Sequence, residues 1–161
     1  MEKLDNDIEL LRNLKIEIHS LRKCFDNISD EMVLDNLKKI IIISEKIYKE
    51  VAVDSLKLNK VKNYIRFYLP TVIKVLERYI KFKDSKINNK EMVALYTKIE
   101  EFLPKAYESF KKIHDSLFTS EIIDIDSEIK IMLKEMGYNI WKIIFQELSL
   151  NISLEIIKKM L

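Results

Sequence analysis

The sequence predicts one all-α domain over residues 1–161, a bundle of about five to six long antiparallel helices. Apolar residues recur at steps of three and four through most of the chain, which is the spacing of one helix face. One glycine and two prolines leave few points at which a helix must end. Hydrophobic residues make up 48% and charged residues 34%, a mixture that suits amphipathic helices in water.

The first two helices are expected at about residues 2–27 and 29–52. A seam that includes Leu11 and Ile18 runs along the first and faces one partner. Because the seam is long, it also fits dimerisation. Ser29 is expected to cap the second helix, since a hydroxyl at this position accepts a bond from a free backbone N–H.

The third helix is expected at about residues 56–82, with a kink or a break near residue 70. Pro70 lacks a backbone donor and disfavours the α conformation at Leu69. Asn88, three positions before Glu91, has the spacing of a capping box. It predicts the start of a fourth helix.

The fourth helix should end near Phe118, and Asp124 is expected to cap a shorter fifth helix. Gly137 can adopt the left-handed conformation that ends a helix, and Tyr138 would then meet Leu133 in a Schellman motif.

Residues 138–161 are expected to form an amphipathic extension whose stripe is aromatic and aliphatic: Ile140, Trp141, Ile144, Phe145 and Leu148. Two interpretations stay open for this extension. It docks on its own bundle, or it binds a partner or a membrane surface.

Composition excludes several classes of function. One glycine is too few for a Walker A loop or a dinucleotide fingerprint. The formal charge of +2 creates no field that would attract nucleic acid. Cys24 is the single cysteine, so neither an internal disulfide nor a multi-cysteine metal site can form. We expect no cofactor and no nucleic-acid partner. Without a recognisable secretion signal, we expect a cytoplasmic or membrane-peripheral protein.

The only suggestive catalytic dipeptide is His114-Asp115. Helical metal-dependent phosphohydrolases use a His-Asp pair together with a further His and Asp to hold the metals that activate water. His19 lies far upstream and no Glu-x-x-His pair is present. We therefore assign no catalytic, cofactor-binding or metal-binding residue and interpret the dipeptide as helix surface.

A set of residues from about Ser29 to Gly137 resembles the XpaC-type family, which is named for 5-bromo-4-chloroindolyl phosphate hydrolysis. The resemblance rests on the Tyr-Leu-Pro-Thr run and on apolar and polar positions after it: Tyr68, Leu69, Pro70, Thr71, Leu76, Tyr79, Phe110, Phe118, Asp126 and Gly137. It implies a bacterial helical protein that is often associated with TelA-type toxic-anion-resistance proteins. It supplies no mechanism, because the family name describes a phenotype.

Three hypotheses follow. The leading one is a non-catalytic protein that binds another protein, in an envelope-stress or anion-resistance system, through the helix seam at residues 2–27 or the run from Tyr68 to Thr71. The second is a phosphatase of aryl phosphates. The third is a peripheral membrane protein anchored by the stripe of residues 138–161.

Overall fold

The computed structural model describes residues 1–161, all of them in helices and the short connections between them, with no strand. The chain divides into two compact units, Met1–Leu117 and Phe118–Leu161. The all-α prediction is confirmed. Each unit has its own architecture and is described by itself.

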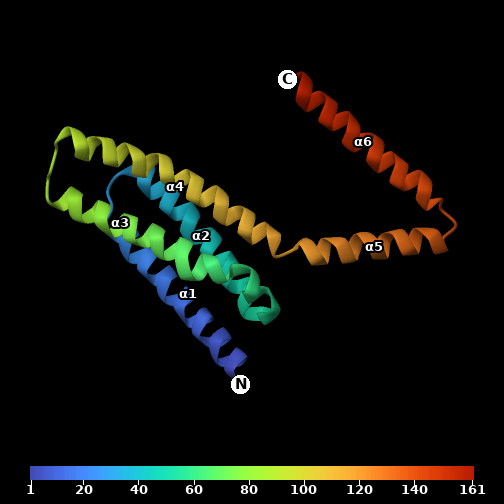
Figure 1. The fold of residues 1–161 in the computed structure, drawn as a ribbon, viewed down its shortest axis with the longest axis horizontal. Helices are drawn as coiled ribbons and strands as arrows, with labels where there is room; N and C mark the ends of the chain where they lie inside the picture. Colours follow the sequence, from blue (N-terminus) through green and yellow to red (C-terminus); the bar gives the residue numbers. More distant parts are fainter. The chain divides into compact units, whose positions relative to one another are not determined.

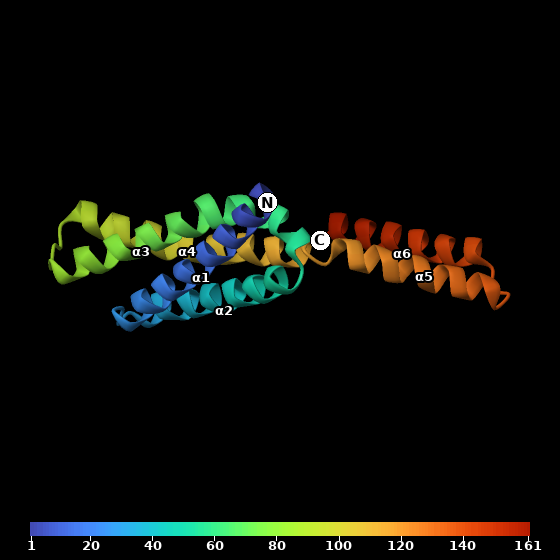
Figure 2. The same cartoon turned by 90° about the horizontal axis from the view of Figure 1, so that it is seen from below.

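The first unit is a closed four-helix bundle. Its elements are α1 (Glu2–Asp26), α2 (Glu31–Val53), the 3₁₀ helix η1 (Ser55–Val61), the π-helical turn η2 (Tyr64–Tyr68), α3 (Leu69–Asp84) and α4 (Lys90–Ser116). α1 packs on α2 and α3, and α4 packs on the same two helices from the other side. Figures 1 and 2 show α2 and α4 running in the same direction. The loops from α1 to α2 and from α3 to α4 are short, as is usual between neighbouring antiparallel helices.

Aliphatic side chains from all four helices fill the bundle. Fully covered leucines and isoleucines come from each helix and include Leu14, Leu21, Leu37, Ile40, Ile47, Leu69, Leu76 and Leu103. Burying one such side chain stabilises a fold by about 1.5 to 3 kcal/mol. The middle of the α1 seam, from Leu14 to Leu21, therefore lies inside the bundle, where Ile18 is 7% exposed, while Leu4 at its N-terminal end is exposed. This corrects the expectation that the α1 seam is open to a partner or to a second copy.

Two predicted caps are off by one residue. α2 is capped by Asp30, not Ser29, because the Asp30 carboxylate accepts from the backbone N–H groups of Met32 and Val33 at 3.0 and 3.2 Å. α4 is capped by Asn89, not Asn88, with its side-chain oxygen 2.9 Å from the N–H of Met92. In both pairs the adjacent polar residues compete, and the one nearer the helix reaches the free donors.

The irregular backbone near residue 70 lies before the proline. Pro70 occupies the first turn of α3, where its missing donor costs little. The turn η2 before it is π-helical, and the N–H of Leu69 donates to the carbonyl of Tyr64, five residues back. Leu69 itself stays helical at φ −65° and ψ −46°. The residues expected to begin one long helix at 56 form the 3₁₀ helix η1 instead.

The second unit is a hairpin of α5 (Thr119–Glu135) and α6 (Ile140–Met160). Gly137 at φ +92° ends α5 in the predicted Schellman motif: the N–H of Tyr138 donates to Leu133 O at 2.9 Å, and that of Gly137 to Lys134 O at 3.0 Å. The predicted cap at Asp124 is wrong, because α5 begins at Thr119 and continues through it. No helix of the chain has both the length and the apolar character that crossing a membrane requires.

Candidate functional site

An apolar groove of about 460 Å³ lies between the start of α3 and the middle of α4. Tyr68 and Thr71 line it from the Tyr-Leu-Pro-Thr run, and the α4 side supplies Phe102, Ala106, Ser109, Phe110, Lys112 and Ile113. We call it the motif groove. Here motif residues border open space.

Local structure sets how the motif residues divide between groove and core. Tyr68 is the last residue of the π turn η2 and is half exposed, while Leu69 begins α3 and is fully buried. Thr71 points outward and its hydroxyl donates to Phe67 O at 2.6 Å, a bond that occupies a backbone carbonyl beside the proline.

The remaining motif residues of the bundle are core residues. Leu76 and Tyr79 are buried, and the Tyr79 ring meets Tyr96 edge to face with centroids 5.6 Å apart. Burial raises the pKa of Tyr79 to about 12, with nearby carboxylates adding to the effect. Phe110 is buried against Tyr64 at 4.9 Å. It supports the groove from beneath.

Three motif positions belong to the second unit. Phe118 is half buried just before α5, Asp126 pairs with Lys130 at 2.8 Å on the surface of α5, and Gly137 ends that helix. All three lie in or next to α5, and none of them lines the motif groove.

The polar core beneath the groove contains a hydroxyl pair and a carboxylate. Tyr64 donates to the hydroxyl of Ser44 at 2.6 Å, and both side chains are buried. Burial raises the pKa of Tyr64 far above its usual value. The carboxylate of Glu17 has one buried oxygen without a hydrogen-bond partner, and burial raises the pKa of Glu17 to about 8.

We expect the stability of the bundle to fall as the pH rises from about 4.5 to about 8. Glu17 binds its proton more tightly in the folded chain, so ionisation above its unfolded pKa penalises the fold, and the penalty is complete above pH 8. Glu17→Gln should remove it and raise the free energy of unfolding at pH 8.5 by about 2 kcal/mol. This is less than the full shift implies, because Glu17 is part-buried and water screens it.

Urea unfolding at pH 5 and pH 8.5 measures this difference. Glu9→Gln, at an exposed position of the same helix, is the matched control and should leave the pH dependence of the wild type unchanged. If the unfolding free energy of Glu17→Gln changed between pH 5 and pH 8.5 as much as that of the wild type, Glu17 would not be the source of the pH dependence.

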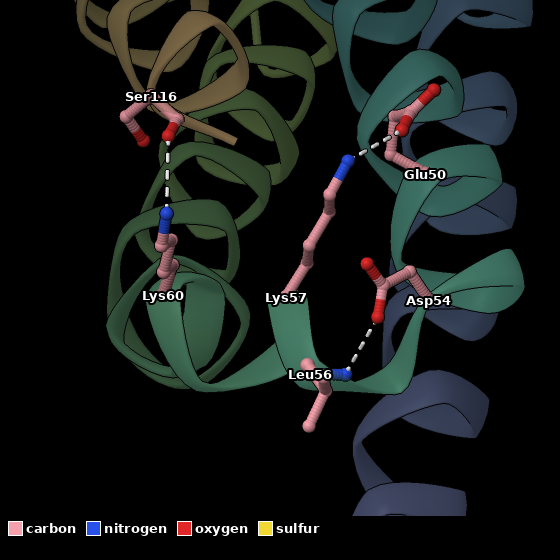
Figure 3. Close-up of polar contacts among 6 residues, drawn as sticks. All are labelled: Glu50, Asp54, Leu56, Lys57, Lys60 and Ser116. Carbon is pink, nitrogen blue, oxygen red and sulfur yellow. Dashed lines mark hydrogen bonds and ion pairs between the residues drawn. The ribbon is translucent and has the colours of Figure 1, made fainter. Parts of the chain in front are cut away.

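The corner after α2 holds the groove-bearing segment in place (Figure 3). Asp54 caps η1 by accepting from the N–H of Leu56 at 3.1 Å. Lys57 is 8% exposed and its ammonium group is 3.1 Å from Glu50. Lys60 donates to the carbonyl of Ser116 at 3.4 Å, and a cation suits this end of α4 because the last carbonyls carry partial negative charge. The corner thus ties η1 to α2 and to α4.

A second groove, of about 340 Å³, lies between α1 and α2 and is basic. Its lining includes Lys15, His19 and Arg22 from α1 with Tyr48 and Lys49 from α2. Glu45 pairs with Arg22 at its edge. This groove was not predicted from the sequence, because its lining comes from two different helices. The spacing of Lys15, His19 and Arg22 at i, i+4 and i+7 is the signal that could have found half of it.

The His114-Asp115 dipeptide lies at the end of α4. The two side chains contact each other, with His114 Nδ1 3.1 Å from an Asp115 carboxylate oxygen. The Asp115 side chain is 64% exposed. Nowhere in residues 1–161 do three His, Cys, Asp or Glu side chains converge as a metal site would need. Cys24 is buried, and burial raises the pKa of its thiol to about 11, which favours the unreactive thiol form.

Comparison with protein families gives one match. The family model described as 5-bromo-4-chloroindolyl phosphate hydrolysis protein matches residues 6–132. The matched segment covers most of α1, all of α2 to α4 and most of α5, and it therefore begins earlier than the resemblance at residue 29 suggested. No curated protein and no solved structure matches the chain.

Proposed function

The chain belongs to the 5-bromo-4-chloroindolyl phosphate hydrolysis protein family, and because the matched residues include the whole motif groove, we propose that this groove binds another protein without catalysing a reaction. The observation that carries the proposal is the groove itself. It is an apolar hollow beside the half-exposed ring of Tyr68, and such hollows accept the large anchoring side chains of protein partners.

The rim of the groove indicates the chemistry of the partner. Lys112 and the hydroxyl groups of Thr71 and Ser109 border an otherwise apolar lining. A helix or an extended segment with an aromatic or aliphatic anchor beside a carboxylate fits this pattern. A TelA-type toxic-anion-resistance protein is the partner to test first, and this link to anion resistance or envelope stress is part of the proposal.

Titration calorimetry with a purified TelA-type protein tests the proposal. Tyr68→Ala should weaken binding at least tenfold, because it removes the ring that borders the groove. Phe67→Ala is the matched control: this neighbouring aromatic residue is 60% exposed and does not line the groove. Equal affinities of the two variants would contradict the groove, and no binding by the wild type would exclude this partner.

A second function, hydrolysis of aryl phosphates, is favoured by the family description and by the basic groove between α1 and α2. Lys15, His19 and Arg22 could hold a phosphate group there, while Ile18 and Tyr48 offer apolar surface for an aromatic ring.

The test is turnover of 5-bromo-4-chloroindolyl phosphate by the purified chain with added Mg²⁺, Mn²⁺ or Zn²⁺. Loss of turnover in Arg22→Ala would assign it to the basic groove. Loss in His114→Ala and Asp115→Ala would assign it to the dyad at the end of α4. No turnover with any of these metals would reject the hydrolase.

A further inference from the structure

The hairpin of α5 and α6 leaves almost all of its apolar surface uncovered. No residue of either helix is fully buried, and the apolar side chains that are largely covered are few: Leu133, Ile140, Ile143 and Ile144. Surfaces of this kind mark interaction sites, because single soluble helices gain most of their stability by burying an apolar face.

The apolar residues of α5 form a regular seam. Five of them follow one another at steps of three, four, three and four residues, and all are more than half exposed: Ile122, Ile125, Ile129, Met132 and Met136. This is the a/d pattern by which one helix packs along another. α6 does not cover the seam. The side of α5 that meets α6 instead carries Lys130, whose ammonium group is 3.8 Å from Glu147 of α6.

The apolar residues of α6 lie on two opposite sides of the helix. At 100° per residue, Trp141, Phe145, Leu148 and Ile152 share one side, and Leu150, Leu154 and Ile157 share the other. Viewed along each helix from its N-terminus, the α5 seam and the stripe of Leu150, Leu154 and Ile157 are rotated in the same direction away from the face that contacts the other helix. Because the helices are antiparallel, the two stripes lie on the same side of the hairpin. Together they form what we call the hairpin face.

A membrane surface is a poor occupant of this face. An interfacial helix buries one apolar side and carries basic residues on the other. α6 is apolar on two sides, and residues 118–161 contain seven acidic and five basic side chains. A helical protein partner fits better.

The charges that border the two stripes suit a second hairpin as the partner. Glu121, Glu128 and Glu135 border the α5 seam at seven-residue spacing on the side away from α6. The matching border of α6 carries Lys142, Gln146, Ser149 and Ser153 and no acidic residue. When α5 packs against α6 of another copy, the three glutamates of each α5 lie beside this non-acidic border of the other copy's α6. Packing α5 on α5 would bring the glutamates together.

The size of the hairpin face also suits a dimer. α5 and α6 contain 17 and 21 residues, so they are about 25 and 30 Å long and match one another in a second copy. Eight seam and stripe residues with on the order of 80 Å² exposed on each supply about 650 Å² per copy. A stable interface uses about 800 Å² per partner, including its polar rim.

We propose that the hairpin face pairs with the same face of a second copy, with α5 of each chain antiparallel to α6 of the other, so that two hairpins form a four-helix bundle. The interface is self-complementary, as two-fold symmetry requires. This inference does not depend on the function of the motif groove.

Sedimentation analysis of the full chain over a range of concentrations tests the proposal with two matched double variants. Ile125→Asp with Ile129→Asp changes the seam, and Ile123→Asp with Ile131→Asp changes α5 away from it. All four isoleucines are between 53% and 59% exposed, and both variants add the same charge. We expect a dimer for the wild type and the off-seam variant, and a dissociation constant at least 100-fold higher for the seam variant.

A charge swap checks the arrangement of the helices. Glu135→Lys should weaken the dimer, and adding Lys142→Glu should restore it. A monomeric wild type, or equal dissociation constants for the two double variants, would overturn the proposal. Co-sedimentation of a monomeric wild type with phosphatidylglycerol vesicles would also overturn it. So would a seam variant that lowers the melting temperature without changing the dissociation constant of the dimer.

Discussion

Leu14→Asp should strongly destabilise the four-helix bundle. Leu14 has no exposed surface and lies on the seam of α1, among side chains that cannot pair with a carboxylate. Burying an unpaired charge there costs several kcal/mol. Because small domains are stable by only about 5 to 15 kcal/mol, we expect loss of at least half of the unfolding free energy, measured by circular dichroism in urea.

Leu4→Asp is the matched control for this prediction. Leu4 lies on the same helix and continues the same seam, but it is 61% exposed. We expect its unfolding free energy to stay within about 0.5 kcal/mol of that of the wild type. If Leu14→Asp were as stable as Leu4→Asp, the seam of α1 would be a surface for a partner and not part of the core.

This pair of variants also shows what the sequence could and could not predict. The three- and four-residue spacing of Leu14, Ile18 and Leu21 identifies one apolar face of a helix, and the structure places all three inside. The spacing does not say whether the face meets another part of the same chain or another molecule. That depends on whether enough helices fold back to cover it, which is a property of the whole bundle.

The backbone near Pro70 could be predicted only in part. The proline indicates a disturbance of the helix, but its position does not show that η2 would take the extra residue before it. Tyr68 and Leu69 are neighbours in the sequence, yet Tyr68 lines the groove and Leu69 lies in the core. The motif groove could not be derived from the sequence, because its lining comes from η2, α3 and α4 together and the spacing of apolar residues does not specify how these elements pack.

The hairpin was easier to predict at its turn than at its start. Gly137 is the only glycine, and a left-handed residue followed by Tyr138 is a strong local signal. Asp124 is also a good capping residue, yet α5 begins five residues earlier at Thr119 without a side-chain cap. A capping residue such as Asp124 does not by itself begin a helix where the helical spacing of apolar residues continues on both sides of it.

Phe110→Ala should lower the unfolding free energy of the bundle by about 3 to 5 kcal/mol. The ring is 2% exposed and meets Tyr64 edge to face at 4.9 Å and 82°. Its removal leaves a cavity next to the buried pair of Tyr64 and Ser44, and close-packed neighbours collapse only partly into such a space. About 1 kcal/mol of the loss should come from the aromatic pair. Chemical denaturation measures the total.

Tyr64→Phe separates the aromatic contact from the hydrogen bond beneath it. This variant keeps the ring pair with Phe110 but leaves the buried hydroxyl of Ser44 without its donor, which should cost about 1 to 2 kcal/mol.

A loss below 1 kcal/mol in Phe110→Ala would mean that the ring is not packed as described. Because Phe110 supports both the core and the motif groove, weaker partner binding by Phe110→Ala would not locate the binding surface. Tyr68→Ala changes the groove at an exposed position and keeps the two effects apart.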